Sequence, residues 1–401
     1  MEQEALALTT MIVGILIALS LLSRIFLPKI SIPIVIGYIA IGLLTRWLDN
    51  GYGFLSGNNL HPIEFLSEIG IILLLFKVGL ESNIDSLMEQ LPQALWIWFW
   101  NVTISGAVGF LTSYYILGID IIPSLFIATA MTATSIGISV ALWKERGILQ
   151  TKKGQLMLDV AQLDDLSSVA ILALLLAVAP ILNSSSTILS LDMIGMIIVK
   201  FVIILIGFTV LCIFLSKKII PYIKLLKLTN SESIILVTSV GFIIASLGSF
   251  LGLSIAIGAF FAGLIFSNNS EIIKNQTYYV SLYDFFIPFF FIGIGLKIDP
   301  SLLSEYFVMG IVLLIAAIIG KVVGTGLPAI RYAGLSGAMF IGVSMVPRAE
   351  IAMLVMKEGL SLGQWAVSSD IFAAMSLVTI GTVIITPLAL NLIKKEDSSK
   401  V

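Results

Sequence analysis

The sequence has few of the residues from which soluble enzymes build their surfaces and their active sites. Only 11% of its 401 residues are charged, whereas a soluble globular domain has about 25%. The single cysteine, Cys212, excludes an intramolecular disulfide, and the single histidine, His61, excludes a histidine-based metal site. The net charge of −2 and the lack of a basic cluster argue against nucleic-acid binding.

Motifs of enzyme chemistry are also missing. The chain has no phosphate-binding loop, no accessible cysteine–histidine pair and no nucleophile elbow. Primary pumping by ATP within this chain is therefore excluded, and we expect neither an enzyme nor a bound cofactor. The first residues carry Glu2 and Glu4 in place of a basic region, so we expect the first apolar stretch to remain as a helix and not to be cleaved as a signal peptide.

The sequence is rich in hydrophobic residues, and these are arranged in long stretches. Hydrophobic residues make up 58% of the chain, and stretches of about 20 of them recur, the length that crosses a bilayer as a helix. The sequence predicts an all-α polytopic protein embedded in a lipid bilayer, with about 13 transmembrane helices and no soluble domain. The expected spans are 5–23, 30–48, 64–80, 90–117, 120–142, 154–180, 188–216, 231–249, 251–267, 278–297, 305–333, 336–359 and 367–393.

The distribution of lysine and arginine agrees with an odd number of spans. With the odd-numbered loops in the cytoplasm, 15 basic residues lie on that side and only 3 on the other. Cytoplasmic loops are enriched in basic residues. We therefore expect the N-terminus outside and the C-terminus in the cytoplasm.

Thirteen spans also divide into two groups of six joined by one helix. We expect a single transporter domain over 1–401, with a first repeat at about 1–180, a connector helix at 188–216 and a second repeat at 231–393. Corresponding spans then run in opposite directions, as in inverted repeats. Spans 120–142 and 336–359 correspond, and both contain helix-weakening residues at mid-membrane. No convincing residue-level repeat accompanies this pattern, so the symmetry is a hypothesis.

The span 154–180 contains two adjacent acidic residues, Asp164 and Asp165, about ten residues from its start. An ionised aspartate at mid-bilayer costs about 2.5–3.5 kcal/mol on insertion scales, and intramembrane carboxylates usually mark ion or proton paths. The two side chains differ by about 100° around the helix, so one can face a cavity while the other takes a partner. Gln162 shares the face of Asp165. The alternative is a purely structural pair that joins helices by hydrogen bonds.

Lys321 lies near the middle of span 305–333. A lysine at that depth cannot easily reach either interface, so it needs a carboxylate partner or must lose its proton. Asp164 and Asp165 are the obvious partners. A switchable bridge is favoured over a purely structural one.

Polar residues also flank the two expected helix interruptions. Arg348 and Glu350 lie beside Pro347, where the arginine could hold freed backbone carbonyls and the glutamate could balance its charge or the positive ends of the half-helices. Both residues could equally belong to the ion path. At the other interruption, Thr132, Thr134 and Ser135 offer hydroxyl groups. These hydroxyls either cap freed backbone groups or contact an ion directly. Lys77, in an i,i+4 pair with Glu81, is expected to be an interfacial anchor, and the role of Lys200 is open.

In this order, these motifs resemble those of bacterial monovalent cation/proton antiporters of the second cation/proton antiporter family, particularly the sodium/proton exchangers. The ordered set with paired aspartates and a later lysine is specific, although each piece alone is not. The matching segments are Pro33 to Tyr38, Gly70 to Phe76, Gly79 to Glu81, Thr132 to Gly137, Asp164-Asp165, Gly252 to Gly263, Pro288 to Leu296, Gly320-Lys321 and Val346 to Glu350. Two residues depart from the family pattern, namely Lys77 and Ala349.

The resemblance implies a 13-helix fold with crossed discontinuous helices, and a homodimer in which a dimerisation domain carries a moving core. It implies that Asp165 is the principal cation and proton site, that Asp164 is its neighbour, and that Lys321 forms a salt bridge with the pair. It also implies electrogenic exchange of two protons against one sodium ion.

The sequence therefore predicts a secondary active sodium/proton antiporter of a bacterial or archaeal cytoplasmic membrane. Sodium ions prefer oxygen ligands, so Asp165 and Asp164 would bind Na⁺ and protons in competition, and transport would depend steeply on pH. The alternatives are potassium/proton exchange through the same site, or an ion channel or the membrane part of a receptor, whose buried charges serve gating.

Overall fold

The structure is a computed structural model, and its residues form two compact units. It describes residues 2–30, 32–55, 57–81, 91–135, 139–140, 143, 148–149, 151–183, 199, 203, 207–208, 210–211, 214–215, 217–218, 221, 229–251, 255–267, 276–298, 300 and 305–393. Unit 1 comprises Met1–Phe26, Gly37–Ser86 and Ile188–Leu296, and unit 2 comprises Leu27–Ile36, Leu87–Thr187 and Lys297–Val401.

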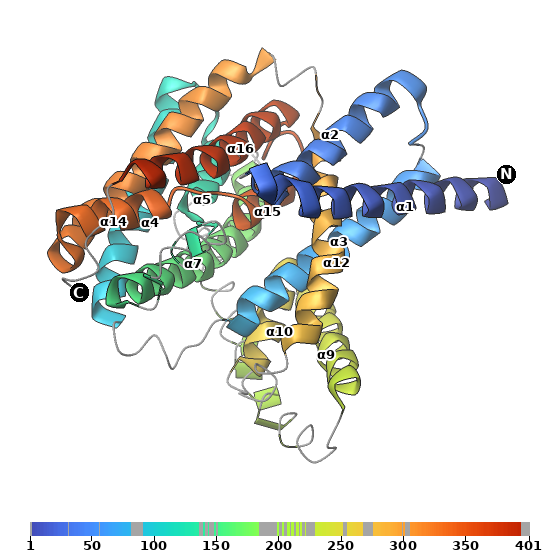
Figure 1. Cartoon of the computed structure of the whole chain (residues 1–401), viewed down its shortest axis with the longest axis horizontal. Helices are drawn as coiled ribbons and strands as arrows, with labels where there is room; N and C mark the ends of the chain where they lie inside the picture. Colours follow the sequence, from blue (N-terminus) through green and yellow to red (C-terminus); the bar gives the residue numbers. More distant parts are fainter. Residues whose placement is uncertain are drawn as a thin grey trace. The chain divides into compact units, whose positions relative to one another are not determined.

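All regular structure in the described residues is helical. Unit 1 contains α1 (Glu2–Phe26), most of α2 (Ile34–Tyr52), α3 (Gly57–Glu81), α9 (Asn230–Phe250), α10 (Ile255–Phe266) and α12 (Gln276–Lys297). Unit 2 contains α4 (Leu91–Leu111), α5 (Ile121–Thr132), α7 (Lys152–Asn183), α14 (Phe307–Ser344), α15 (Glu350–Leu362) and α16 (Ser369–Leu392), which are gathered together in Figure 1. Helices suit this chain because backbone groups in lipid must be satisfied within their own segment.

Six of these twelve described helices are long and apolar enough to cross a membrane by length and composition. The expectation of a polytopic helical membrane protein is therefore met at the level of fold class. The count of 13 spans is not established, because most of the expected connector at 188–216, including Lys200, lies outside the described residues.

The helix breaks expected from glycine and proline are present at three places. α9 ends at Phe250 and α10 begins at Ile255, at the expected boundary between spans 231–249 and 251–267. α14 has a non-helical residue at Gly334, whose φ of 68° favours glycine, so the expected boundary between 333 and 336 is a sharp kink. α14 then ends at Ser344 and α15 begins at Glu350, which leaves Pro347 in the interruption.

Two pairs of glycines bring helices of unit 1 into backbone contact. A Cβ atom on Gly42 of α2 would meet the carbonyl of Ile292 in α12, and a Cβ atom on Gly295 would meet the carbonyl of Ile39. Gly79 of α3 and Gly263 of α10 repeat this arrangement. Each of them faces the carbonyl three residues before the other, those of Phe260 and Phe76. The two crossings therefore have the same register, and no side chain fits between their backbones.

The close crossing of α3 and α10 makes a larger residue costly. The change Gly263→Leu is expected to lower the stability of the protein by at least about 1–3 kcal/mol, because the side chain overpacks a backbone contact. The midpoint of thermal unfolding in detergent measures this effect. Gly14→Leu on α1 is the matched control, since a Cβ there meets nothing within 4 Å, and an equal shift in both variants would contradict the prediction.

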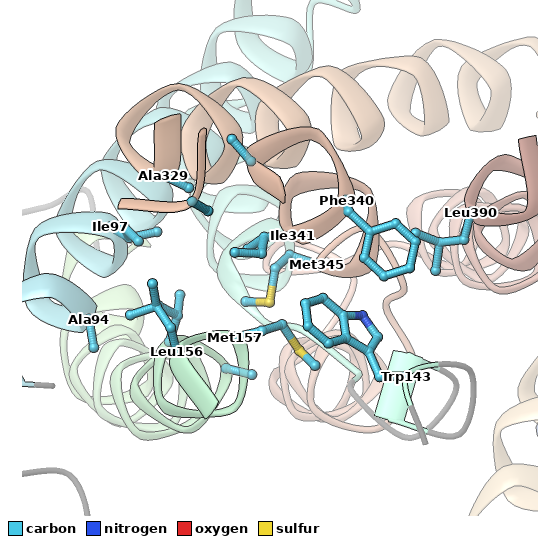
Figure 2. Packing of buried hydrophobic residues seen from close by; sticks show 14 residues of the cluster. Ala94, Ile97, Trp143, Leu156, Met157, Ala329, Phe340, Ile341, Met345 and Leu390 are labelled. Carbon is cyan, nitrogen blue, oxygen red and sulfur yellow. The ribbon is translucent and has the colours of Figure 1, made fainter. Parts of the chain in front are cut away.

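Unit 2 has its apolar core where α4, α7 and α14 meet. Ile97, Met157 and Ile341 are fully buried there, and Figure 2 shows Met157 beside the indole of Trp143. The Trp143 ring lies 5.0 Å from the ring of Phe340. This cluster fixes the start of α7 against the last turns of α14.

Candidate ion-binding site

The two helix interruptions of unit 2 meet each other through their backbones. α5 ends at Thr132, and Ala133 to Ser135 continue as non-helical chain. The backbone N–H of Ser135 donates a hydrogen bond to the carbonyl of Pro347, at 2.8 Å. Broken helices within the membrane need such partners, because neither lipid nor the helix itself satisfies the freed groups.

Arg348 holds the interruptions together. Its side chain is fully buried. Its guanidinium donates to the carbonyl of Ala133 at 2.8 Å and to the carbonyl of Ala317 in α14 at 3.2 Å. Its backbone N–H donates to the hydroxyl of Thr382 in α16 at 3.2 Å. Arg348 thus brings a positive charge into the interruption between α14 and α15, where it satisfies carbonyls of two other segments.

Asp164 of α7 is fully buried beside the first interruption. Lys321 of α14 donates from Nζ to Asp164 Oδ2 at 2.8 Å. The hydroxyl of Thr134, in the interruption itself, donates to the same oxygen at 2.7 Å. The amide of Asn101 in α4 donates from Nδ2 to Oδ1 at 2.8 Å and to Oδ2 at 2.7 Å. Three side chains from three segments therefore donate to one carboxylate.

Lys321 is also fully buried and has a second acceptor. Its Nζ atom lies 2.7 Å from the carbonyl oxygen of Thr132, the last helical residue of α5. The ammonium group thus joins the carboxylate of α7 to the freed end of α5. Of the two partners that the sequence left open for Lys321, the structure places Asp164 in direct contact.

Glycines on α14 allow these groups to reach Asp164. The backbone of α14 approaches α4 where Gly320 faces Ser105 and Gly324 faces Asn101, each with a space of 3.2 Å between the partner Cα and an added Cβ. Lys321 directly follows the first of these glycines. These glycines therefore allow α4 and α14 to approach closely enough for both Asn101 and Lys321 to contact Asp164.

The other expected site residues lie around this centre. Asp165 is partly buried on α7. Gln162 is also partly buried, and its Oε1 atom accepts no hydrogen bond in the described part of the chain. The hydroxyl of Thr132 lies 2.9 Å from that of Ser168 on α7. Glu350 opens α15 and is partly buried, and it is not among the described side chains that contact Asp164.

Two residues of the site were missed by the sequence reasoning. Asn101 lies mid-way along an apolar span, and a polar side chain at that depth could have identified it. Trp143 donates from its indole N–H to the hydroxyl of Ser344 at 2.8 Å, which ties the segment after the first interruption to the end of α14. No sequence pattern pointed to this contact.

Lys77 lies in unit 1, in the last turns of α3, with its ammonium 4.4 Å from the ring centre of Tyr283. This cation–π contact gives the lysine an aromatic neighbour within its own unit. The side chain of Glu81, expected to pair with it, is outside the described part of the structure.

Six helices that are long and apolar enough to cross a bilayer, and a buried charge pair at two touching helix interruptions, are features expected of a multi-pass membrane transporter. The profile of the family described as "Sodium/hydrogen exchanger, transmembrane" matches residues 15–395. The chain belongs to this family.

Several relatives have similar sequences over most of their length. The high-affinity Na⁺/H⁺ antiporter NhaS3 of Synechocystis is 31% identical, over 84% of this chain and 73% of that protein. The Na⁺/H⁺ antiporter of Enterococcus hirae is 29% identical, over 92% and 93%. The structure of the sodium proton antiporter MjNhaP1 from Methanocaldococcus jannaschii superposes with a TM-score of 0.74 over 98% of this chain and 100% of that one. Its sequence is 17% identical, so this likeness concerns the fold.

Proposed function

We propose that the protein is a secondary active sodium/proton antiporter in which Na⁺ and protons compete for Asp165. The observation that carries the proposal is the fully buried pair of Asp164 and Lys321, 2.8 Å apart at the helix interruptions and next to Asp165 in the chain. Burying two charges is costly, so a purely architectural role would be met more cheaply by neutral polar residues. In a family of membrane ion exchangers, a role in ion binding accounts for this cost.

The proposed cargo fits the ligands near Asp165. Na⁺ prefers oxygen ligands, and the buried Oε1 atom of Gln162, one helical turn before Asp165, is a carbonyl oxygen with no hydrogen bond in the described residues. The hydroxyls of Thr132, Thr134 and Ser135 lie in or beside the interruption. The carboxylate of Asp165 binds either a proton or the cation, and this competition couples the two fluxes.

The exchange is proposed to be electrogenic, with two protons moving against one sodium ion. The support is the arrangement of charges, in which Lys321 contacts Asp164 and Asp165 is the adjacent carboxylate on the same helix. A cation bound at Asp165 is repelled by the Lys321 ammonium, so loading of the site and the charge on Lys321 are coupled. Arg348 is proposed to hold the helix interruption together, and Glu350 is proposed to balance the positive charge there.

Alternating access is proposed to arise from two inverted repeats, 1–180 and 231–393, on either side of a connector at 188–216. The matched register of the Gly42–Gly295 and Gly79–Gly263 crossings supports this arrangement, because exchange of the repeats would superpose one pair on the other. We also propose that the protein forms a homodimer, with its N-terminus outside the cell and its C-terminus in the cytoplasm. The orientation is supported by the distribution of basic residues.

Potassium is the alternative cargo for the same site. The relatives include one named Na⁺/H⁺–K⁺ antiporter GerN of Bacillus cereus, 29% identical over 90% of this chain. Another, the chloroplastic K⁺ efflux antiporter 2 of Arabidopsis thaliana, is 25% identical over 82% of this chain. Oxygen ligands alone do not separate the two cations.

The test uses proteoliposomes that contain the purified protein and an internal pH dye. Adding Na⁺ or Li⁺ outside is expected to make the interior alkaline, because protons leave as the cation enters, and K⁺ is expected to give no response. A response to K⁺ would assign the cargo to the alternative. Cation uptake without any proton movement would indicate a channel and would overturn the proposal.

A further inference from the structure

We propose that a cavity in unit 1 binds the headgroup of a phospholipid that carries a primary ammonium group, namely phosphatidylethanolamine. The cavity has a volume of about 460 Å³, within the range of about 300–1,000 Å³ that is typical of small-molecule sites. It is lined by residues of α1, α2 and α12 that all belong to unit 1. The inference is independent of the antiporter function proposed above, because the proposed ion site lies in unit 2.

Tyr38 of α2 is the buried polar side chain that indicates a ligand. The residue is only 5% exposed, and it lines the cavity together with Arg24 and Asp284. Its hydroxyl makes no hydrogen bond in the described part of the chain, and it lies within electrostatic reach of both charged groups. A buried hydroxyl without a partner is costly, so we expect an occupant of the cavity to supply one.

Arg24 and Asp284 give the cavity a positive and a negative group side by side. The guanidinium of Arg24, in the last turn of α1, forms an ion pair with the carboxylate of Asp284 on α12. Both side chains remain partly exposed. Arginine has further N–H donors and a carboxylate has further lone pairs, so each group can bind a ligand without breaking the pair. A phosphate can accept from Arg24 and Tyr38 while an ammonium group donates to Asp284.

The cavity adjoins an exposed apolar surface. Leu21 of α1 and Phe285 of α12 line the cavity, and each is about half exposed. On α1 the exposed apolar surface continues at Leu22 and Ile25. These α1 residues belong to the apolar segment Leu6–Lys29, which is long enough to cross a membrane, and acyl chains are as apolar as leucine side chains. An occupant with a charged head and apolar tails therefore matches both parts, and a phospholipid has this structure.

The two charges of the cavity select among phospholipids. Phosphatidylglycerol has no cationic group, so its phosphate would place two negative charges beside one arginine. Phosphatidylcholine is zwitterionic, but its quaternary ammonium has no N–H to donate to Asp284. Phosphatidylethanolamine balances both charges, and its ammonium donates a charge-assisted hydrogen bond, which is stronger than a neutral one.

The first test compares these three lipids, with identical acyl chains, by native mass spectrometry of the purified protein in detergent. Phosphatidylethanolamine is expected to bind about tenfold more tightly than phosphatidylcholine, because a hydrogen bond to a charged group is lost with the latter. Asp284→Asn is expected to abolish this preference and to make phosphatidylglycerol the preferred lipid, since the site then has a net positive charge. Equal binding of the three lipids to the wild type, or a preference for phosphatidylglycerol, would overturn the inference.

The second test removes only the hydroxyl of Tyr38. Tyr38→Phe is expected to weaken the binding of phosphatidylethanolamine by about threefold to tenfold, while thermal unfolding of the lipid-free protein stays unchanged. Tyr279→Phe is the matched control, because Tyr279 is also 5% exposed but donates its hydroxyl to the backbone carbonyl of Leu73 at 2.6 Å. This control is expected to bind the lipid as the wild type does and to unfold at a lower temperature. Unchanged lipid binding in Tyr38→Phe would contradict the proposed site.

A second copy of the chain is the other occupant that the exposed apolar surface of α1 could take. The same spectra report the mass of the assembly, and we expect the preference for phosphatidylethanolamine to be equal in any monomer and dimer that they resolve. If Tyr38→Phe instead weakened dimerisation in lipid-free detergent and left lipid binding unchanged, the cavity would be assigned to an interface between copies. The lipid inference would then be overturned.

Discussion

Replacing Asp165 by asparagine is expected to reduce cation-dependent proton movement to the level of liposomes without protein. Asparagine has the same size and keeps hydrogen-bonding groups, but it cannot take up a proton at transport pH and cannot neutralise a cation. Asp164 cannot substitute for it, because its carboxylate is fully buried and holds donors from Asn101, Thr134 and Lys321. The measurement is alkalinisation of the interior on addition of Na⁺, with protein incorporation checked for each variant.

The control for this variant removes a carboxylate elsewhere in the same unit. Asp120 is exposed and precedes α5 as its N-cap residue without a side-chain cap hydrogen bond. Asp120→Asn makes the same change of charge and is expected to retain exchange. If Asp165→Asn exchanged cations at the wild-type rate, the cation site would have to be assigned to another residue. Loss of exchange in both variants would point to the overall charge of the protein and not to the site.

Much of the candidate site was accessible to sequence reasoning because buried charges in apolar spans are conspicuous. Asp164, Asp165, Lys321 and Arg348 each interrupt a hydrophobic stretch. The pairing between them was not accessible, since Asp164 and Asp165 are neighbours that point about 100° apart. Which of them meets Lys321 depends on the rotation of α7 relative to α14. That rotation is set by packing over many residues.

Asn101 illustrates a second limit. A neutral polar side chain costs less to bury than a charge, so it stands out less from the sequence, and its role depends on a neighbour 63 positions away. The approach of α4 to α14 at Gly320 and Gly324 creates this role. The glycines were visible in the sequence, but their partners were not.

The fold was predicted best where the chain itself prevents a helix. Proline and glycine at 347 and 334 mark the interruption and the kink because their backbones do not fit a continuous helix. The matched glycine crossings of unit 1 were not predicted, although Gly37 and Gly42 have the same spacing as Gly258 and Gly263. Spacing shows where a backbone can be approached, and only the packed helices show by which partner.

Replacing Lys321 by glutamine is expected to destabilise the protein by about 3–5 kcal/mol, because it leaves the Asp164 carboxylate buried without its opposite charge. Lys321 and Asp164 are both fully buried and 2.8 Å apart. The double variant Asp164→Asn/Lys321→Gln removes both charges and is expected to recover most of the loss. Thermal unfolding in detergent of the wild type, both single variants and the double variant completes the cycle.

The same double variant tests the proposed role of Lys321 in charge transfer. In the wild type, a potassium diffusion potential set with valinomycin should change the rate of Na⁺/H⁺ exchange, because net charge crosses the membrane in each cycle. If the second transported charge depends on Lys321, the folded double variant exchanges ions through Asp165 at a rate that the potential does not affect. A rate that still responds to the potential would remove Lys321 from the transport cycle. Together with full recovery of stability, it would leave the buried pair as a structural element of the two interruptions.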